Sequence, residues 1–278
     1  MIDLSRVRHV VLDMDGTLYR GTRLFAATMP FLERLRSLGI GYTFLTNNTS
    51  RSKADYVTKL RGLGIEASAS EIYTPAESTM AYLRSRLPQV KTVALLGTPS
   101  LAQEFADAGY AVNWDAPDAV VVGFDTTLTY ERLCRAAYWI GAGLPFLATH
   151  PDLVCPTGEL TVLVDCGSVC ACLTAATGRH PMVFGKPSPS ILLELCGRLQ
   201  LAADELAMVG DRIYTDIRMA QEAGVPSVLV LTGEATAADA AGMPNQPDLV
   251  VADIGELGER LDSARCASGG VKIPWRSK

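Results

Sequence analysis

The segment His9-Val10-Val11-Leu12-Asp13-Met14-Asp15-Gly16-Thr17-Leu18 carries the strongest structural signal in this chain. Its apolar run ending in Asp13 is typical of a buried parallel strand. In an open α/β sheet, ligands bind outside the carboxyl ends of the strands, where Asp13 and Asp15 would lie. Gly16 permits a sharp turn that points both carboxylates at one place. Two such carboxylates can share a cation, or they can act as nucleophile and general acid/base. An Asp-Gly pair without the rest of the motif would instead favour an ordinary turn.

Strand-like and helix-like segments alternate along most of the chain. We expect strands at 9–13, 40–46, 92–96, 119–122, 145–148, 206–209, 227–231 and from 249, and helices at 28–38, 53–63, 99–108, 129–141, 168–177, 188–199, 214–223 and 254–261. Thr28 is the expected N-cap of the first helix. The alternation predicts an α/β fold with a Rossmann-like parallel sheet and helices on both faces.

Polar residues follow further apolar runs. Thr46, Asn47 and Asn48 end the second strand, where a hydroxyl and backbone amides can grip a phosphate oxygen. Lys186 lies between Gly185 and Pro187 just before a helix. A fixed lysine there would offset the repulsion between a phosphate dianion and a carboxylate nucleophile.

The hexapeptide Asp13 to Leu18 resembles the first motif of the haloacid dehalogenase superfamily, Asp-x-Asp-Gly-Thr-Leu, and the other motifs follow in the superfamily's order. The resemblance implies that Asp13 is the nucleophile. It implies that Asp15 protonates the leaving alcohol and then activates water. The superfamily's dehalogenases lack the second aspartate, so Asp15 indicates phosphoryl chemistry.

The resemblance also assigns the remaining motif residues. Thr46, Asn47, Asn48 and Lys186 would bind the phosphate. Mg²⁺ would contact the Asp13 side chain, the Asp15 backbone carbonyl and Asp211, which lies in Val209-Gly210-Asp211-Arg212. Asp216 would orient Asp211 or Lys186 from behind.

About 140 residues separate Thr46 from Lys186, far more than one connection needs. We therefore expect a discontinuous core domain, 1–77 and 180–262, with an inserted α/β cap domain at 78–179 and a C-terminal tail at 263–278. The inserted segment resembles the cap of subfamily IIA, the para-nitrophenyl phosphatase and phosphoglycolate phosphatase-like branch.

Two sequence features of the cap differ from that branch. Leu147-Ala148-Thr149-His150-Pro151-Asp152 resembles the branch's Ala-Thr-Asn-Pro-Asp, with His150 in place of asparagine. Two roles for His150 stay open: a structural one, and contact with the substrate that sets specificity. Val164 to Ser168 stands where the branch has a Pro-Gly-x-Gly type turn, so the resemblance does not assign the substrate of any one relative to this chain.

Composition limits the choice of partners. The net charge of -5 gives no basic track for nucleic acid, and the longest charge-free run, 136–151, is too short and broken to span a bilayer. We expect a cytoplasmic enzyme acting on a small-molecule phosphomonoester, with no nucleic-acid or membrane partner; a homodimer formed through the cap is a further expectation. The cysteines, including Cys166, Cys170 and Cys172, fit no zinc spacing and are expected to be reduced thiols.

The function that the resemblance implies is a magnesium-dependent phosphatase that hydrolyses sugar phosphates, phosphoglycolate-type acids or nucleotide monophosphates through an aspartyl-phosphate. Two alternatives stay open: a phosphotransferase or phosphomutase of the same superfamily, and an inactive phosphate-binding relative. A receiver domain would use similar residues, but it carries its acceptor aspartate on the third strand and has no inserted domain.

Overall fold

The computed structural model describes residues 2–155 and 160–267. The chain divides into two compact units. Unit 1 comprises Met1–Leu45, Gly62–Glu66 and Pro187–Lys278, and unit 2 comprises Thr46–Arg61 and Ala67–Lys186. The predicted domain boundaries at 77/78 and 179/180 stay predictions, and the tail residues 268–278 lie outside the described residues.

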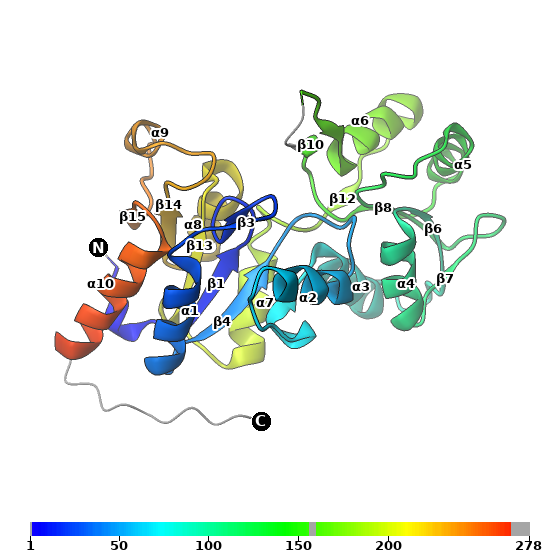
Figure 1. Ribbon diagram of the computed structural model, residues 1–278. Helices are drawn as coiled ribbons and strands as arrows, with labels where there is room; N and C mark the ends of the chain where they lie inside the picture. The colour runs from blue at the N-terminus through cyan, green and yellow to red at the C-terminus, as the bar shows by residue number, and fades with distance from the viewer. Residues whose placement is uncertain (1, 156–159, 268–278) are drawn as a thin grey trace. The chain divides into compact units, whose positions relative to one another are not determined.

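Unit 1 contains a parallel sheet whose strands run in the order β15-β14-β13-β1-β4 (Figure 1). The strands are β1 (His9–Asp13), β4 (Gly41–Leu45), β13 (Leu206–Gly210), β14 (Ser227–Val230) and β15 (Leu249–Val251). β1 lies in the middle, with Leu12 in register with Val209 of β13 and Asp13 in register with Leu45 of β4. The predicted α/β architecture is confirmed, and the central position of β1 explains its unbroken apolar run.

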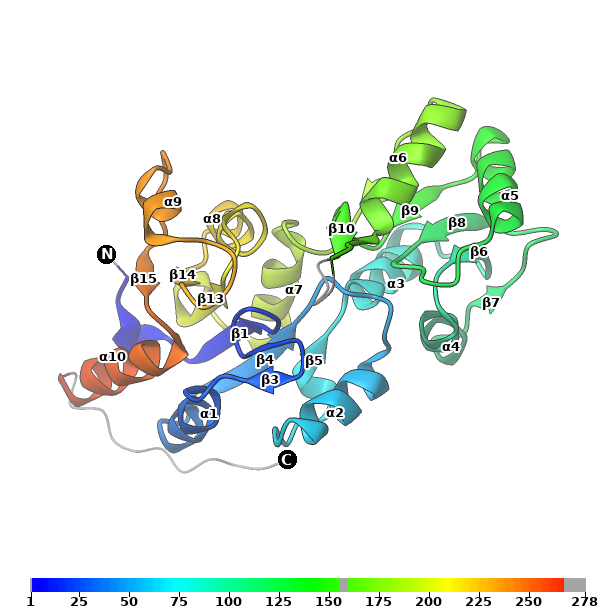
Figure 2. The same cartoon turned by 45° about the horizontal axis from the view of Figure 1, so that its top comes forward.

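Helices cover both faces of this sheet. On one face α1 (Thr28–Ser37) packs against α10 (Ile254–Ala267), and on the other α7 (Ser190–Leu199) packs against α8 (Arg218–Ala223) (Figure 2). A turn of π-helix, Ile213–Ile217, leads into α8, and α9 (Ala237–Ala241) precedes β15. A small hairpin, β2 (Tyr19–Arg20) and β3 (Arg23–Leu24), follows the acidic motif.

The predicted capping role of Thr28 is wrong. Helix α1 begins at Thr28 with Ala27 as its N-cap, and no side-chain hydrogen bond caps it. The buried Thr28 hydroxyl instead donates to the backbone carbonyl of Leu18 at 2.6 Å. A tertiary hydrogen-bond acceptor beside the acidic motif thus takes the hydroxyl that local sequence assigned to the helix end.

Unit 2 contains a second parallel sheet with the order β12-β9-β8-β6-β7. Its strands are β6 (Thr92–Leu96), β7 (Ala111–Val112), β8 (Ala119–Val122), β9 (Phe146–Ala148) and β12 (Met182–Val183), and its helices are α3 (Pro75–Arg86), α4 (Pro99–Asp107), α5 (Tyr130–Gly141) and α6 (Cys166–Thr177). Short segments complete it: α2 (Lys53–Gly62), β5 (Ile72–Tyr73) and the antiparallel pair β10 (Val154–Cys155) and β11 (Leu163–Val164).

Alternate residues of these strands pack into two separate cores. Val93, Leu95 and Val121 face α3 and α4, whereas Ala94 and Val120 face α5 and α6. Because side chains alternate across a strand, a strand covered on both faces must be apolar at every position. Among residues 2–155 and 160–267, no helix combines the length and apolar character needed to cross a bilayer.

Candidate active site

Asp13 ends β1 and opens a tight turn in unit 1. The backbone N–H groups of Thr17 and Leu18 both donate to the Met14 carbonyl, and Gly16 adopts φ +93°. The Thr17 hydroxyl donates to Asp13 Oδ2 at 3.3 Å. Asp13 is buried while Asp15 is exposed, so this short turn gives the two carboxylates different surroundings.

Three buried carboxylates gather at the carboxyl ends of β1 and β13. Oxygens of Asp13, Asp211 and Asp216 all lie within 4.8 Å of one another. Asp211 Oδ1 is buried and has no hydrogen-bond partner among the described residues. Burial, together with the charges of Asp13 and Asp216, raises the pKa of Asp211 to about 7. The sequence predicted Asp13 and Asp211 as neighbours and placed Asp216 behind them, whereas the structure brings all three together.

The loop after β14 holds these groups in place, and the sequence analysis did not identify it. The Glu234 N–H donates to Asp211 Oδ2 at 2.8 Å, and the Thr232 hydroxyl donates to the Gly16 carbonyl at 2.6 Å. A Cβ on Gly233 would lie 1.8 Å from Asp211 Oδ2, so only glycine permits this approach. The signal was available, because Thr232-Gly233 follows an apolar strand at the same edge of the sheet.

Arg212 is a further residue of the site for which no role was predicted from the sequence. Its Nε lies 3.1 Å from Glu234 Oε2. Burial alone would lower the pKa of Arg212, but the charges of Asp13 and Asp211 raise it above its ordinary value. A fixed guanidinium beside the carboxylates partly offsets their negative charge.

Unit 2 carries the predicted phosphate-binding residues. Thr46 directly follows β4, and its Oγ1 accepts the Asn48 N–H at 3.1 Å, which keeps its O–H available as a donor. Asn48 Oδ1 accepts from the Ser50 N–H at 2.9 Å and from its hydroxyl at 2.7 Å. The side chain of Asn48 therefore shapes the turn that presents Thr46.

Asn47 binds the backbone of Lys186. Its Oδ1 accepts the Lys186 N–H at 2.8 Å, and its Nδ2 donates to the Lys186 carbonyl at 3.0 Å. Lys186 is 4% exposed. The structure thus brings Asn47, which follows Thr46 directly, into contact with Lys186, although Lys186 lies about 140 positions further along the chain.

His150 is fully buried, with both ring nitrogens engaged. Nδ1 lies 2.9 Å from Thr149 Oγ1, and Nε2 lies 2.9 Å from Asp165 Oδ1. Burial lowers the pKa of His150, but Cys166, Asp165 and Asp152 raise it overall to about 9. Although His150, Asp152 and Asp165 are close enough to hold a cation, the protonated ring makes this an internal ion pair.

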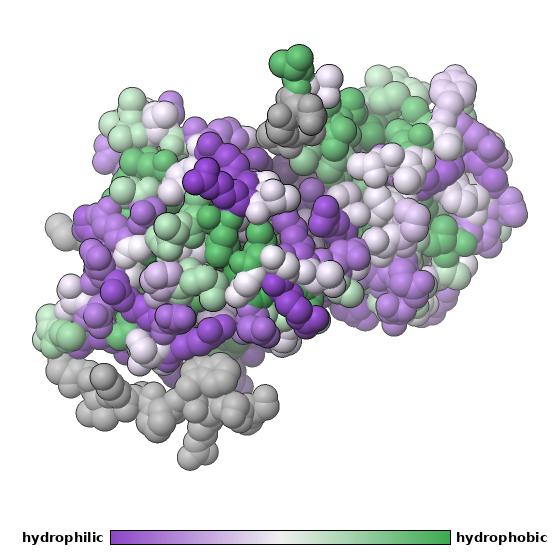
Figure 3. Space-filling model, in the orientation of Figure 1, coloured by the Kyte–Doolittle hydropathy of each residue, from purple (hydrophilic) through white to green (hydrophobic). Residues whose placement is uncertain are grey.

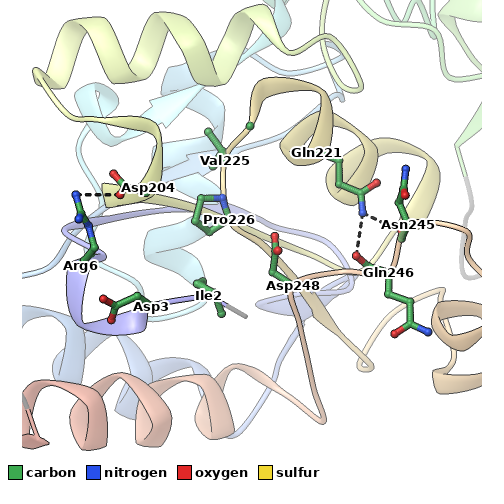
Figure 4. Close-up of a pocket in the computed structure, with 11 residues that line it drawn as sticks. Ile2, Asp3, Arg6, Asp204, Gln221, Val225, Pro226, Asn245, Gln246 and Asp248 are labelled. Carbon is green, nitrogen blue, oxygen red and sulfur yellow. Dashed lines mark hydrogen bonds and ion pairs between the residues drawn. The ribbon is translucent and has the colours of Figure 1, made fainter.

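A pocket of about 640 Å³ lies in unit 1 away from these groups (Figure 4). It is lined by residues that precede β13, β14 and β15, at the amino ends of the strands. Its charged groups are already paired, since Arg6 contacts Asp204 at 2.9 Å and Asp248 accepts from Ser227. We therefore place the chemistry at the carboxyl ends of the strands.

Comparison with known proteins agrees with this geometry. The chain matches the haloacid dehalogenase-like hydrolase family over residues 10–111 and a related HAD-hydrolase-like family over 183–257. It is 31% identical to the acid sugar phosphatase of Staphylococcus aureus, over 93% of this chain and 100% of that protein. This chain belongs to the haloacid dehalogenase superfamily, subfamily IIA.

Solved structures show the same superfamily fold. The 4-nitrophenylphosphatase of Thermotoga maritima aligns with a TM-score of 0.88 at 38% identity, covering 93% of this chain and 99% of that one. The glycerol phosphate phosphatase of Mycobacterium tuberculosis, solved with magnesium, aligns with a TM-score of 0.84 at 34% identity, covering 92% of this chain and 78% of that one. The same enzyme has also been solved with calcium.

The acidic groups of unit 1 could bind a metal ion. Carboxylate oxygens are hard ligands, and Asp211 Oδ1 is a buried acceptor that lacks a partner within the described chain. A divalent cation would offset both the burial and the charges of Asp13 and Asp216 that raise the pKa of Asp211. The donor set therefore fits a hard divalent ion.

Substituting Gly233 with alanine should weaken cation binding. The added Cβ must push the Asp211 carboxylate away from Asp13. We expect millimolar Mg²⁺ to raise the Tm of the unaltered protein and to leave Gly233→Ala almost unchanged, because binding to the native state stabilises it. Gly62→Ala, whose Cβ meets nothing within 4 Å, is the control and should keep the full shift in Tm. An equal shift in Gly233→Ala would contradict the assignment of the cation site.

The buried His150 ion pair should make the stability of the protein depend on pH. The folded pKa of about 9 exceeds the unfolded value of 6.5, so the stabilisation is complete below pH 6.5 and is lost as pH rises through 9. The charges of Cys166, Asp165 and Asp152, which raise the pKa, supply this stabilisation. The Tm difference between the unaltered protein and His150→Asn should therefore shrink between pH 6 and pH 10. A difference independent of pH would rule out a charged His150.

Proposed function

We propose that this protein is a phosphatase that hydrolyses small phosphomonoesters through an aspartyl-phosphate on Asp13. The observation that carries the proposal is the oxygen cluster of Asp13, Asp211 and Asp216, with a buried Asp211 oxygen that has no partner among the described residues. The names of the relatives, an acid sugar phosphatase, a 4-nitrophenylphosphatase and a glycerol phosphate phosphatase, support the same reaction class.

We further propose Mg²⁺ as the cofactor, held by Asp13, Asp211 and the backbone carbonyl of Asp15. When bound, it would offset the negative charge of the phosphate and of the carboxylates. Mg²⁺ suits a site with few protein oxygens, because it keeps several of its waters. Asp216 also accepts the Arg212 N–H at 3.1 Å, which supports its proposed role in orienting the turn that carries Asp211.

Asp13 and Asp15 carry out different steps of the proposed reaction. An Asp13 oxygen attacks phosphorus, and the bond from phosphorus to the ester oxygen breaks. Asp15 gives its proton to the departing alkoxide, then takes a proton from water as that water attacks the phosphoryl group and releases Asp13. Asp15 is exposed in unit 1, which suits a group that exchanges protons with substrate and water.

We propose that Thr46, Asn47 and Lys186 bind the phosphate during this attack. Leu45 pairs in register with Asp13 and is followed in the chain by Thr46. The Thr46 hydroxyl, the backbone amides of the 46–48 turn and the Lys186 ammonium are suitable donors for a phosphate oxygen. The Asn47 side chain is committed to the Lys186 backbone, so Asn47 would contribute through its backbone.

Asp13→Asn tests the proposed function. The two side chains are nearly isosteric, but an amide is a poor nucleophile and a poor cation ligand. We expect the turnover of para-nitrophenyl phosphate with Mg²⁺ to fall by at least about a thousandfold while the fold is retained. A chelator should abolish the activity of the unaltered enzyme. Near-normal turnover in a folded Asp13→Asn protein would exclude the covalent mechanism.

The substrate that we propose is a small phosphomonoester such as a sugar phosphate, a glycolate-type acid phosphate or a nucleotide monophosphate. A folded insertion over the strand ends of the core would restrict access to the site, and the net charge of -5 gives no general attraction for polyanions. A panel of phosphorylated metabolites should yield inorganic phosphate, with no transfer to a second sugar. Equal turnover of a phosphoprotein, or an unchanged substrate profile after replacing residues 147–168 with those of a relative, would contradict this prediction.

A homodimer through the cap and a cytoplasmic location complete the proposal. Apolar side chains of unit 2 are exposed around β10 and β11, where hydrophobic atoms gather in Figure 3, and they offer a surface for a second copy: Leu153, Val154, Leu160, Val162, Leu163 and Val164. Sedimentation velocity would measure whether the protein forms this dimer.

All seven cysteines are free thiols, which supports the proposed location in a reducing compartment.

A further inference from the structure

The side-chain amide of Asn47 has three hydrogen-bond partners, and one of them is Asp152. Nδ2 donates to the Lys186 carbonyl at 3.0 Å and lies 3.1 and 3.2 Å from the two oxygens of Asp152. Oδ1 accepts the Lys186 N–H at 2.8 Å. Two acceptors on one side and a donor on the other fix which way the amide points. Asp152 therefore helps to hold Asn47 in the orientation that binds the Lys186 backbone.

Asp152 is itself held by the N-terminus of α6. The Gly167 N–H donates to the Asp152 carbonyl at 2.8 Å, and the Ser168 hydroxyl donates to the Leu153 carbonyl at 2.7 Å. A Cβ on Gly167 would lie 2.2 Å from the Pro151 carbonyl oxygen, so glycine is needed for this close approach. The segment 151–153 is thereby fixed on both sides of Asp152.

Asp165, the N-cap of α6, also holds the segment 151–153 in place. Asp165 caps the helix by accepting the Cys166 N–H at 2.6 Å, and its Oδ1 also lies 2.9 Å from His150 Nε2. The Asp165 N–H donates to the Leu153 carbonyl at 3.0 Å. A Cβ on Gly185 would come within 2.8 Å of both Asn47 Oδ1 and the Thr149 carbonyl, so the loop that carries Lys186 approaches this segment closely.

We propose that Asp152 is a positioning residue for catalysis, which fixes the Lys186 backbone through Asn47 and is itself fixed by α6. This inference rests on the proposed function, in which Lys186 binds the phosphate. Hydrogen bonds inside unit 2 link α6 to Lys186 through Asp152 and Asn47. His150 contributes from behind Asp165 and does not contact the substrate.

The experiment compares Asp152→Ala with Asp152→Asn in the full-length enzyme. Alanine removes the acceptor of Asn47 Nδ2–H, whereas asparagine keeps a carbonyl oxygen there. Misplacing a charged group by about 1 Å can cost a hundredfold in rate, so we expect Asp152→Ala to lower kcat ten- to a hundredfold on para-nitrophenyl phosphate. KM should change by less than about threefold, since the loss falls on the transition state, and Asp152→Asn should restore most of kcat.

Asp118→Ala is the matched control. Asp118 accepts the backbone N–H groups of Lys91 and Thr92, both at 2.8 Å, and the Thr92 hydroxyl at 2.9 Å, at the amino end of β6. Its loss should lower Tm about as much as Asp152→Ala and leave kcat unchanged. If Asp152→Ala does not fold, Asp152→Ser, whose hydroxyl is too short to reach Asn47, should show the same fall in kcat.

The Lys186→Met variant distinguishes failure of the proposed phosphate site from failure of the positioning role of Asp152. If Lys186→Met keeps its activity, the proposed phosphate site fails. If Lys186→Met is inactive but Asp152→Ala keeps kcat like Asp118→Ala, only the positioning role is overturned. An Asp152→Asn variant as slow as Asp152→Ala would also overturn it, since the hydrogen bond would then not be the cause.

Discussion

The mutual repulsion of Asp13, Asp211 and Asp216 is the constraint on which unit 1 depends. Burial and two neighbouring charges raise the pKa of Asp211 to about 7, and its Oδ1 has no partner among the described residues. Burying such a cluster is costly unless the surrounding structure, a proton or a cation compensates its charge. The Glu234 N–H on Asp211 and the Arg212 guanidinium supply part of that compensation. The acidic groups that remain could bind a hard cation.

The topology of the sheet follows from the need to bring these groups together. β1 lies between β13 and β4, so strands far apart in the sequence end side by side. Leu12 is in register with Val209, which places Asp13 and Gly210 one residue further along, followed by Asp211. Gly16 and Gly233 lack the side chains that would otherwise collide with Asp211. The strands set the spacing of the carboxylates, and the two glycines allow the flanking loops to close around them.

The sequence predicted those features whose cause is local. The alternating α/β pattern is confirmed because each strand buried on both faces must be apolar throughout, and Asp13 and Asp211 stand out because each directly follows such a run. The commitment of the Asn47 side chain to Lys186 and Asp152 could not be predicted, since it joins residues separated by 139 and 105 positions. Thr28 failed as a predicted cap for the same reason: a tertiary acceptor, the Leu18 carbonyl, competes with the helix end.

The two units solve the same electrostatic problem in different ways. Unit 2 also buries a carboxylate, Asp165, but supplies its own cation, the imidazolium of His150, whose ring also reaches Thr149. The neutral asparagine usual in this branch of the superfamily would leave Asp165 without that charge. A cluster neutralised from within has no need of a metal and can serve as a rigid support for Asp152. In unit 1 the Arg212 guanidinium offsets only part of the negative charge, and Asp211 Oδ1 has no hydrogen-bond partner among the described residues. This difference fits a chemical role for the cluster of unit 1 and a supporting role for that of unit 2.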